Sequence, residues 1–546
     1  MSCRPANLQE YDKPYFDFDS LVNKQIQMFS TRKDSIRKVA ELDAKTSVSS
    51  FVIDSTHLAH EWDVFRQLDW INKPLFKGNY EITEGADTKS NLMVRSYVAK
   101  KSSNQSIKFA VPFVHFYYQD DFQGEAGAEL YFDSELSGDH GLRLVEVDAR
   151  NKIISENVTR PPVQGKNIKL SIDSRIQHVL HENIKQVAQD VGFIGGAGVI
   201  MDINTGQVIA ITSYPEYSSQ IMSDKSDSNA VKAMLNDKSL PFLDRAIDGL
   251  YAPGSVVKIF IALGVLNEKI VTPEQIIMTN GSISLPNLYD STKSTIFRDW
   301  KNHGPLDMRH ALSVSSDVYF YTVGGGFENQ KGLGIRKIDE YLKMFGFGTT
   351  TLDNSNSLLL GKAGTIPTPE WKKKTFGEAW YVGNTYHTSI GQYGFQVTPI
   401  QIARAVSAVA NFGMIYSPTI LADQSPNIES EISIPKSYFD VVHDGMRLSV
   451  TDGTSKSLNI PKFEIAAKSG TAELGYSKEK INSWMTGFWP YKNPRYAFVV
   501  MLEKGTVHYQ IGAGAVMRQT LDWMYENTPE YFDNRVRNDP EKGGDI

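Results

Sequence analysis

A serine is followed three residues later by a lysine at Ser255 and Lys258, within the segment 251–258 (YAPGSVVK). A serine hydroxyl is a weak nucleophile and needs a base to accept its proton. Burial among apolar residues, or a second cation nearby, favours the neutral amine that can be this base. Pro253-Gly254 interrupts the chain just before the apolar run IFIALGVL. The spacing therefore predicts that Ser255 begins a helix and that Lys258 lies one turn later on the same face, as nucleophile and base for acyl transfer.

This pair alone is a weak signal, because the chain contains two others of the same spacing. They are Ser35 with Lys38, predicted on a polar helix face, and Ser477 with Lys480, predicted in a loop. An isolated Ser-x-x-Lys is in most proteins a solvated pair without chemical function. The interpretation of Ser255 therefore depends on whether further motifs of the same chemistry occur in the chain.

Two further segments are such motifs. Ser315-Ser316-Asp317 lies inside the helical stretch ALSVSSDVYFYTV, and Lys468-Ser469-Gly470-Thr471 lies in the strand-like AAKSGTAEL. Taken singly, the first reads as a helix break and the second as an ordinary edge strand. In this order after Ser-x-x-Lys, however, they form the set found in β-lactamases and penicillin-binding proteins.

Over residues of about 124–526 the chain resembles the class B penicillin-binding proteins, and among them the penicillin-binding protein 2 subfamily of the rod-elongation system. The resemblance extends to LYFDSELSGDHGLRLVEVDARNKII, to VIMDINTGQVIAITSYPEY, to FRDWKNHG and to NTYHTSIGQYGFQVTPIQIA. It implies an α+β transpeptidase domain, in which an antiparallel sheet is flanked by helices and joined by an all-helical subdomain. A separate, smaller α+β region is expected before it.

The resemblance also implies a role for each residue. Ser255 would be acylated and Lys258 would be its general base, while Ser315 would relay a proton to the leaving group. Asp317 stands where many relatives have Asn. Lys468 would set the electrostatics and, with Ser469, Gly470 and Thr471, bind the substrate carboxylate. The backbone N–H groups of Ser255 and Thr471 would form the oxyanion hole.

The implied reaction is attack on the D-Ala-D-Ala bond of a peptidoglycan stem peptide, followed by acyl transfer to an amine of a neighbouring stem. β-Lactams would acylate Ser255, and a membrane glycosyltransferase of the elongation machinery is an expected partner. The implied location is the periplasm or extracytoplasmic cell envelope, with membrane association in the full-length form. No cofactor is expected.

Some relatives bind zinc near the second motif through Asp, His and Cys. Here Asp290, Asp299 and His303 are candidate ligands, but the thiolate position is occupied by Ser316 and the one cysteine is Cys3. Because zinc sites of this kind rely on soft ligands, we expect no metal.

The length of 546 residues predicts two or three domains. The net charge of −6 argues against nucleic acid as the main partner. A single cysteine excludes an internal disulfide, and the chain has neither a run of 18 apolar residues nor the apolar core of a signal peptide at its start.

Apolar periodicity predicts the elements that position the motifs. We expect a helix over 18–43, strands over 51–120, a helix at 174–191 followed by a hairpin, and largely helical structure over 306–345. A further helix is expected within 395–413, from Thr-Pro to Gly, and a terminal helix at 511–526. The expected domains are an atypical N-terminal region (1–122), a pedestal remnant (123–165), the transpeptidase domain (166–526) and a flexible tail (527–546). Residues 1–122 also resemble Bacteroidota lipoproteins of unassigned role.

Three alternatives remain open. A β-lactamase would share the acylation but needs a base that activates water, and no clear Glu-x-x-Leu-Asn segment is found. A β-lactam sensor would need a membrane-signalling partner. A non-catalytic envelope scaffold would not need Ser255, Lys258 and Lys468 intact.

Overall fold

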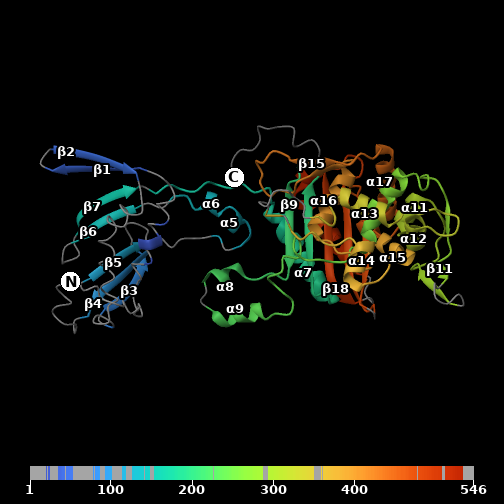
Figure 1. Ribbon diagram of the computed structural model, residues 1–546, viewed down its shortest axis with the longest axis horizontal. Helices are drawn as coiled ribbons and strands as arrows, with labels where there is room; N and C mark the ends of the chain where they lie inside the picture. Colours follow the sequence, from blue (N-terminus) through green and yellow to red (C-terminus); the bar gives the residue numbers. More distant parts are fainter. Residues whose placement is uncertain are drawn as a thin grey trace, which may run out of the picture. The chain divides into compact units, whose positions relative to one another are not determined.

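The structure, a computed structural model, describes most of the chain. It covers residues 20, 22–24, 27, 35–42, 45–52, 78, 80–86, 93–100, 113–118, 124, 126–139, 142–147, 153–160 and 162–532, with gaps in the last range at 225–226, 287–292, 350–357, 360, 476–477 and 507–510. The chain divides into two compact units, Met1–Lys166 and Asn167–Ile546 (Figure 1). The finer division predicted at residue 122 stays a prediction.

The first unit consists mainly of antiparallel strands. They form a hairpin, a three-stranded sheet in the order β3-β4-β5, and a second hairpin. The elements are β1 (Ser35–Leu42), β2 (Lys45–Val52), β3 (Tyr80–Ala86), β4 (Met93–Ala99), β5 (Phe113–Tyr118), α5 (Gly127–Tyr131), α6 (Asp133–Leu136), β6 (Leu142–Val147) and β7 (Ile153–Arg160). The strands predicted within 51–120 are confirmed at β3, β4 and β5.

The helix predicted over 18–43 is wrong for its second half, which forms β1. Each residue of β1 is paired with β2, from Ser35 opposite Val52 to Leu42 opposite Lys45. Pairing with a neighbouring segment can override a weak local helical pattern, because it satisfies the backbone hydrogen bonds in another way. The Ser35–Lys38 pair therefore lies on a strand, whereas Ser477 lies outside the described residues.

The second unit is built on a five-stranded antiparallel sheet in the order β16-β17-β18-β8-β9. Its strands are β8 (Gly195–Asp202), β9 (Val208–Tyr214), β16 (Ala466–Leu474), β17 (Lys480–Trp489) and β18 (Tyr496–Thr506). Since β16 lies at the edge, one side of it is open to another strand or to an extended ligand.

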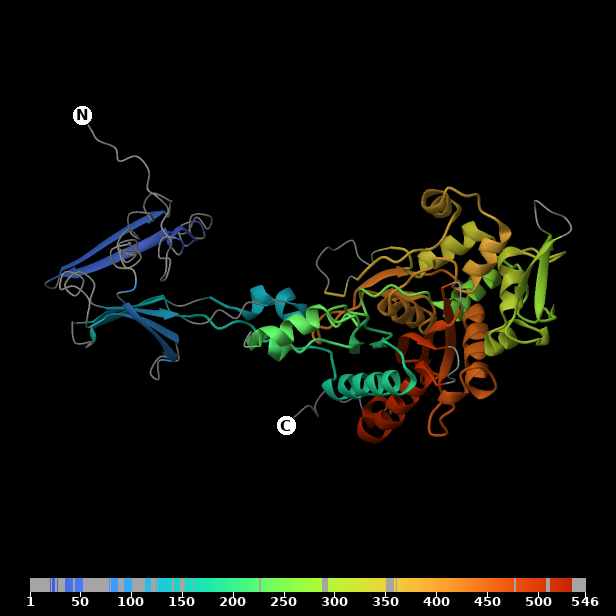
Figure 2. The same cartoon turned by 90° about the horizontal axis from the view of Figure 1, so that it is seen from below.

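Helices cover both faces of this sheet. On one face lie α7 (Ser174–Val191) and α18 (Ala513–Asn527), which Figure 2 shows side by side in teal and red. Their apolar residues form one cluster with Phe498, Val500 and Leu502 of β18. The other face is covered by α16 (Pro399–Ala410), which packs on β8, β17 and β18. This two-sided burial explains why β8 is buried at every position.

The remaining elements form the helical part and its small hairpins. They are α8 (Ser219–Asp224), α9 (Ser228–Leu235), η3 (Gly254–Val257), α10 (Lys258–Asn267), β10 (Ile277–Thr279), β11 (Ser282–Pro286), β12 (Ser294–Arg298), β13 (Gly304–Leu306), α11 (Met308–Val314), α12 (Asp317–Gly325), α13 (Ile335–Met344), α14 (Pro369–Phe376), α15 (Val382–Ser389), β14 (Met414–Tyr416), β15 (Ile428–Glu431), α17 (Lys436–Thr451), η4 (Lys456–Leu458) and η5 (Pro529–Tyr531). The predicted fold class, an antiparallel sheet flanked by helices with a helical subdomain, is confirmed.

Local signals in the sequence explain the best-predicted helices. The α7 helix begins after Asp173, whose side chain accepts a hydrogen bond from Arg175 N, and it ends at Gly192 in the left-handed conformation. The α16 helix begins with a capping box between Thr398 and Gln401. Both helices lie where the sequence predicts them.

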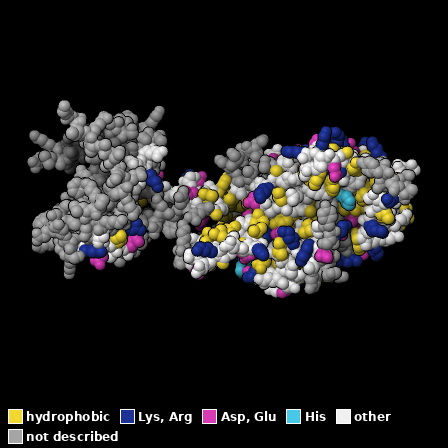
Figure 3. All heavy atoms as spheres, turned by 60° about the horizontal axis from the view of Figure 1, so that its bottom comes forward, with side chains coloured by type: hydrophobic (Ala, Val, Ile, Leu, Met, Phe, Trp, Pro, Cys, Tyr) yellow, Lys and Arg dark blue, Asp and Glu magenta, His cyan; other side chains and the backbone are white. Residues whose placement is uncertain are grey.

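Among the residues that the structure describes, no helix is long and apolar enough to cross a membrane. Figure 3 shows acidic and basic side chains mixed over the visible face of the second unit, with hydrophobic side chains scattered between them. This mixture agrees with the small net charge of −6.

Candidate active site

Ser255 lies in η3, a short 3-10 turn that leads directly into α10. Residues three apart eclipse one another in a 3-10 helix, so the turn places Lys258 on the same side as Ser255. The α10 helix that follows is buried along nearly its whole length. Ser255 itself is only partly buried, and its hydroxyl has no hydrogen-bond partner among the described residues. The nucleophile predicted from the sequence is thus accessible at the start of a buried helix.

Close backbone contacts fix the loop before Ser255. Gly254 has φ +56°, and a Cβ atom there would lie 2.5 Å from the carbonyl oxygen of Thr471. The Gly254 N–H donates to Gly391 O at 3.0 Å, and Trp484 Nε1 donates to Ala252 O at 2.9 Å. Only glycine fits such an approach with positive φ. The third motif therefore lies directly against the nucleophile loop.

The Lys258 amine is fully buried and points toward the second motif. Lys258 Nζ donates to the carbonyl oxygen of Ser315 at 2.7 Å and to Asp317 Oδ1 at 2.6 Å, and it lies 3.4 Å from Ser315 Oγ. The structure thus brings Lys258, Ser315 and Asp317 together.

Ser315 occupies an unusual backbone position between two helices. It ends α11 with φ +58°, in the left-handed region that few residues other than glycine adopt. Ser316 then caps α12, accepting from Tyr319 N at 3.2 Å. Asp299 holds this junction, because its Oδ2 accepts hydrogen bonds from Ser316 Oγ at 2.6 Å and from Val318 N at 3.0 Å.

Lys468 on β16 completes the cluster. Its Nζ donates to Ser315 Oγ at 2.8 Å and to Ser469 O at 2.8 Å, and its side chain is fully buried. Burial lowers the pKa of Lys468 well below its usual range, and the positive charge of Lys258 lowers it further, whereas Asp317 opposes the change. Two lysine amines therefore meet at one serine hydroxyl.

This geometry leaves the Ser315 proton free to be donated. A serine hydroxyl has one donor and two acceptor positions. The two amines point at the acceptor positions of Ser315 Oγ, one at 2.8 Å and one at 3.4 Å. The O–H bond is then free to turn away from the amines, or toward whichever amine is neutral, which suits a group that passes protons.

The other residues of the third motif also lie on the edge strand β16. Ser469 Oγ donates to Thr454 Oγ1 at 2.6 Å, and Thr471 is exposed two positions further along β16. A Cβ at Gly470 would lie 2.8 Å from a Val256 methyl group, so this position also needs glycine. Ser469 and Thr471 share one side of the strand because side chains alternate.

Some residues of the site were not predicted as part of it. The sequence offers Asp299 only as a candidate metal ligand, places His387 only within a family segment, and gives no signal for Thr454. Burial lowers the pKa of His387, while the charges of Asp317 and Glu473 oppose the change. The segment FRDWKNHG before the second motif was the one signal that pointed to Asp299.

The residues near the second motif do not fit a zinc ion. Asp299 Oδ1 lies 3.6 Å from His303 Nε2, but Asp299 Oδ2 is occupied by the Ser316 hydroxyl and a backbone N–H. Asp290 lies outside the described residues. One carboxylate, one imidazole and a hydroxyl provide neither the thiolates nor the further imidazole nitrogens that such sites use. The described part of the chain contains no group of three or more potential ligands, and the expectation of no metal stays a prediction.

Comparisons with known proteins show which families the chain resembles. Residues 196–522 match the family described as "Penicillin binding protein transpeptidase domain", and residues 79–170 match "Penicillin-binding Protein dimerisation domain". The second match begins well before residue 124, where the sequence resemblance was expected to start.

Curated relatives include the peptidoglycan D,D-transpeptidases MrdA of Haemophilus influenzae and Escherichia coli. The first is 32% identical over 461 residues (79% of this chain, 67% of the relative). The second is 31% identical over 427 residues (73% and 64%). The chain thus spans about two thirds of the length of these relatives.

Among solved structures, PBP2 of Pseudomonas aeruginosa in complex with WCK 5153 is 27% identical, with a TM-score of 0.60. The match covers 82% of this chain and 94% of that one.

Proposed function

The chain belongs to the penicillin-binding protein transpeptidase family, and from this premise we propose that it is a peptidoglycan D,D-transpeptidase acting through an acyl-enzyme on Ser255. The observation that carries the proposal is the convergence of the Lys258 and Lys468 amines on Ser315. A buried proton relay beside an accessible serine is what serine acyl transfer needs. Family membership supports the assignment of this chain to the penicillin-binding protein 2 subfamily and a role in cell elongation.

The proton balance of the buried cluster makes a base available. Lys258, Lys468 and Asp317 would carry a net charge of +1 if both amines were protonated. A low-dielectric site disfavours net charge, and the pKa of Lys468 is lowered by burial and by Lys258. One proton shared between the two amines gives a neutral cluster. Ser315 Oγ contacts both amines, so that the proton can move between them.

In the first half of the reaction Ser255 Oγ attacks the carbonyl carbon of the penultimate D-Ala. Its proton passes to Lys258, which gives its own proton through Ser315 to the neutral Lys468. The oxyanion is stabilised by the backbone N–H groups of Ser255 and Thr471. Collapse breaks the peptide bond, and the D-Ala amine leaves with a proton supplied through Ser315.

The second half reverses these steps with a new amine. The amine of a neighbouring stem peptide attacks the ester, loses a proton to the same relay and releases Ser255 Oγ. During the first half, until D-Ala leaves, the terminal carboxylate of the donor is bound by Lys468 with the hydroxyls of Ser469 and Thr471. A β-lactam presents the same carboxylate and a reactive amide, so it acylates Ser255 and stays bound.

The substrate sets the place of action and the partners. Peptidoglycan is assembled outside the cytoplasm, so we place this chain in the cell envelope. A membrane glycosyltransferase that supplies uncross-linked glycan is the partner that fits the reaction.

The test is to give the purified protein a D-Ala-D-Ala peptide donor together with an amine acceptor and to follow the products by mass spectrometry. A transpeptidase releases D-Ala and forms the amide product, and Ser255→Ala forms neither. Rapid hydrolysis of β-lactams without amide product would support a β-lactamase instead. No release of D-Ala and no β-lactam adduct from folded protein would refute the proposal and favour a scaffold.

A further inference from the structure

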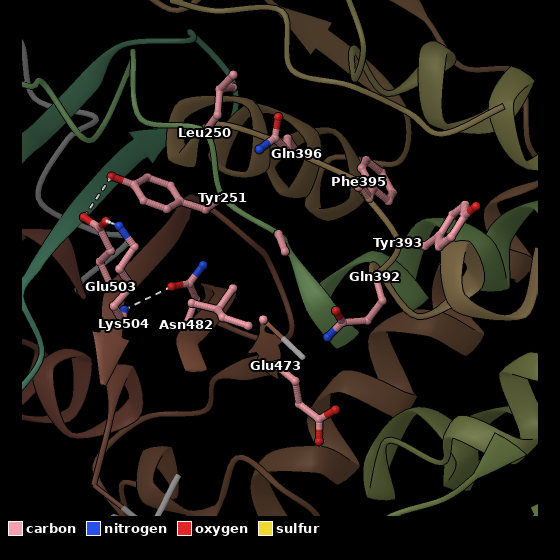
Figure 4. Close-up of a pocket in the computed structure, with 14 residues that line it drawn as sticks. Leu250, Tyr251, Gln392, Tyr393, Phe395, Gln396, Glu473, Asn482, Glu503 and Lys504 are labelled. Carbon is pink, nitrogen blue, oxygen red and sulfur yellow. Dashed lines mark hydrogen bonds and ion pairs between the residues drawn. The ribbon is translucent and has the colours of Figure 1, made fainter. Parts of the chain in front are cut away.

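A pocket of about 290 Å³ lies beside the nucleophile loop. It is lined by the segment just before Ser255, by the loop at 392–396, and by the ends of β16, β17 and β18 (Figure 4). Ala252 and Glu473 both border it, and these residues lie three positions before Ser255 and two positions after Thr471. The pocket therefore adjoins the site of acylation.

Most charge in this pocket is already neutralised. Glu503 is buried, and its carboxylate is within 2.9 Å of Arg245 Nε and 3.0 Å of Lys504 Nζ. Tyr251 OH also donates to it at 3.5 Å. Figure 4 shows Tyr251, Glu503 and Lys504 gathered at one end of the pocket. A ligand would gain little from these groups, because each is engaged with another.

Glu473 is the carboxylate of the pocket that a ligand can reach. Its partner is Lys478, at 2.6 Å, and the side chains of Glu473 and Lys478 are 51% and 64% exposed. Ion pairs of this exposure contribute about 0–1 kcal/mol, so an incoming ammonium group can replace Lys478. The amide side chains of Gln392 and Gln396 line the same pocket and offer neutral acceptors.

The position of Glu473 on the edge strand indicates which part of the substrate it meets. Ser469, Thr471 and Glu473 occupy every second position of β16, so their side chains lie on the same side of the strand. If Lys468 and Ser469 bind the terminal carboxylate, the preceding residues of the donor run along the free edge of β16 toward Glu473. A strand rise of about 3.3 Å per residue puts Glu473 about 7 Å beyond Thr471, or about two residues upstream in the donor.

The charge of Glu473 acts on the same buried ring as the charges of Asp317 and Asp299. Burial raises the pKa of Tyr321, and the charges of Asp317, Asp299 and Glu473 raise it further.

We propose that Glu473 determines donor specificity by binding an ammonium group on the stem-peptide residue that precedes D-Ala-D-Ala. The inference rests on the proposed function, because the direction of the donor follows from the carboxylate site. Glu473 binds the donor itself and is not part of the proton relay.

The experiment compares two donors that differ at one side chain. Both end in D-Ala-D-Ala, one with lysine before it and the other with Nε-acetyl-lysine, and D-Ala release is measured without an acceptor. We expect the wild-type protein to prefer the lysine donor by about 5-fold in kcat/KM, which corresponds to roughly 1 kcal/mol. In Glu473→Gln this preference disappears while the acetylated donor reacts at the wild-type rate.

Two further variants separate the interpretations. Lys478→Ala frees Glu473 and increases the preference for lysine, whereas a merely structural ion pair would make Lys478→Ala and Glu473→Gln behave alike. Glu479→Gln, a nearby exposed glutamate that does not line the pocket, leaves the preference unchanged.

The proposal is overturned if Glu473→Gln lowers kcat/KM equally for both donors. It is also overturned if Glu473→Gln still prefers the lysine donor. A defect confined to amine transfer also overturns it, in favour of acceptor recognition. Failure of the proposed function is distinct, because no donor and no penicillin would then react with any variant.

Discussion

At Ser315 a single hydroxyl lies between two buried lysine amines, with a carboxylate at the far end of the cluster. The charge of Asp317 therefore influences how easily the Lys468 amine loses a proton. It favours the protonated form of Lys468, which burial and Lys258 disfavour. The pH dependence of acylation is the measurement that reports this balance.

We predict that Asp317→Asn shifts the rising limb of the pH profile to lower pH. The substitution removes the negative charge that opposes the lowered pKa of Lys468, so this pKa falls further and neutral amine is present at lower pH. The profile is measured as the second-order rate of acylation by a penicillin from pH 5 to 9. Asp522→Asn, whose carboxylate pairs with Arg518 at 2.6 Å on α18, serves as control. A limb that stays in place or moves to higher pH would contradict the relay.

Between elements, the loop after α15 and the turn that carries Ser255 approach each other closely at two glycines. A Cβ at Gly391 would lie 2.2 Å from the carbonyl oxygen of Gly254, and the φ of Gly391 is +76°. The loop after α15 therefore fixes the position of the turn that carries Ser255. The strength of this coupling can be measured because the chain contains a glycine of similar conformation without a neighbour.

We predict that Gly391→Ala slows acylation and lowers the unfolding temperature more than Gly377→Ala does. Gly377 has φ +72° and nothing within 4 Å of its ideal Cβ. Both variants share the backbone cost of a positive φ, roughly 1 kcal/mol, and Gly391→Ala adds an overpacking cost of roughly 1–3 kcal/mol. Penicillin acylation and thermal unfolding measure the two effects. Equal behaviour of the two variants would show that the loop adapts freely.

The packing of α17 makes the stability of the second unit depend on pH. His443 is buried between Phe412 and Phe488, and its Nε2 donates to Val409 O at 2.8 Å. Burial lowers the pKa of His443, so the unfolded chain binds a proton more readily than the folded one. The neutral imidazole thus contributes stability above its ordinary pKa of about 6.5, and this contribution is lost as the pH falls below it.

We predict that His443→Gln loses less stability than the wild type between pH 7.5 and pH 5.5. Glutamine keeps a donor for Val409 O but does not titrate. The measurement is the fall in unfolding temperature between the two pH values for each protein. Identical falls would mean that His443 makes no contribution in this window.

At the scale of helices and strands, the sequence predicts those elements whose start and end signals lie within a few residues of them. The α7 and α16 helices carry their own caps at Asp173 and Thr398, and the three motifs lie in the predicted order on a helix start, a helix junction and a strand. Contacts between distant segments could not be predicted, because no periodicity links Gly254 to Gly391 or Asp299 to Ser316. The helix expected at 35–42 failed for the same reason, since pairing with β2 decides its structure. The roles of the individual site residues stay predictions.

For the whole molecule, the division into two compact units has a functional consequence. Every residue of the candidate site lies in Asn167–Ile546, and the five-stranded sheet and its covering helices are complete within that unit. The smaller unit contributes nothing to the chemistry described, although the dimerisation-domain match falls mostly within it.

We predict that residues 167–546 fold alone and react with penicillin at a rate close to that of the whole chain. The reason is that the core and all motifs are internal to this unit. Circular dichroism and thermal unfolding establish that the fragment folds, and labelling kinetics establish its reactivity. A folded but unreactive fragment would show that the N-terminal unit is needed to form the site.

The most direct measurement is the intact mass of the whole chain after incubation with a penicillin, followed by peptide mapping. We predict a stable mass increase of one acyl group, located on Ser255 and absent in Ser255→Ala. A folded protein that gains no mass, or that carries the group on another residue, would contradict the assignment of Ser255 as the nucleophile.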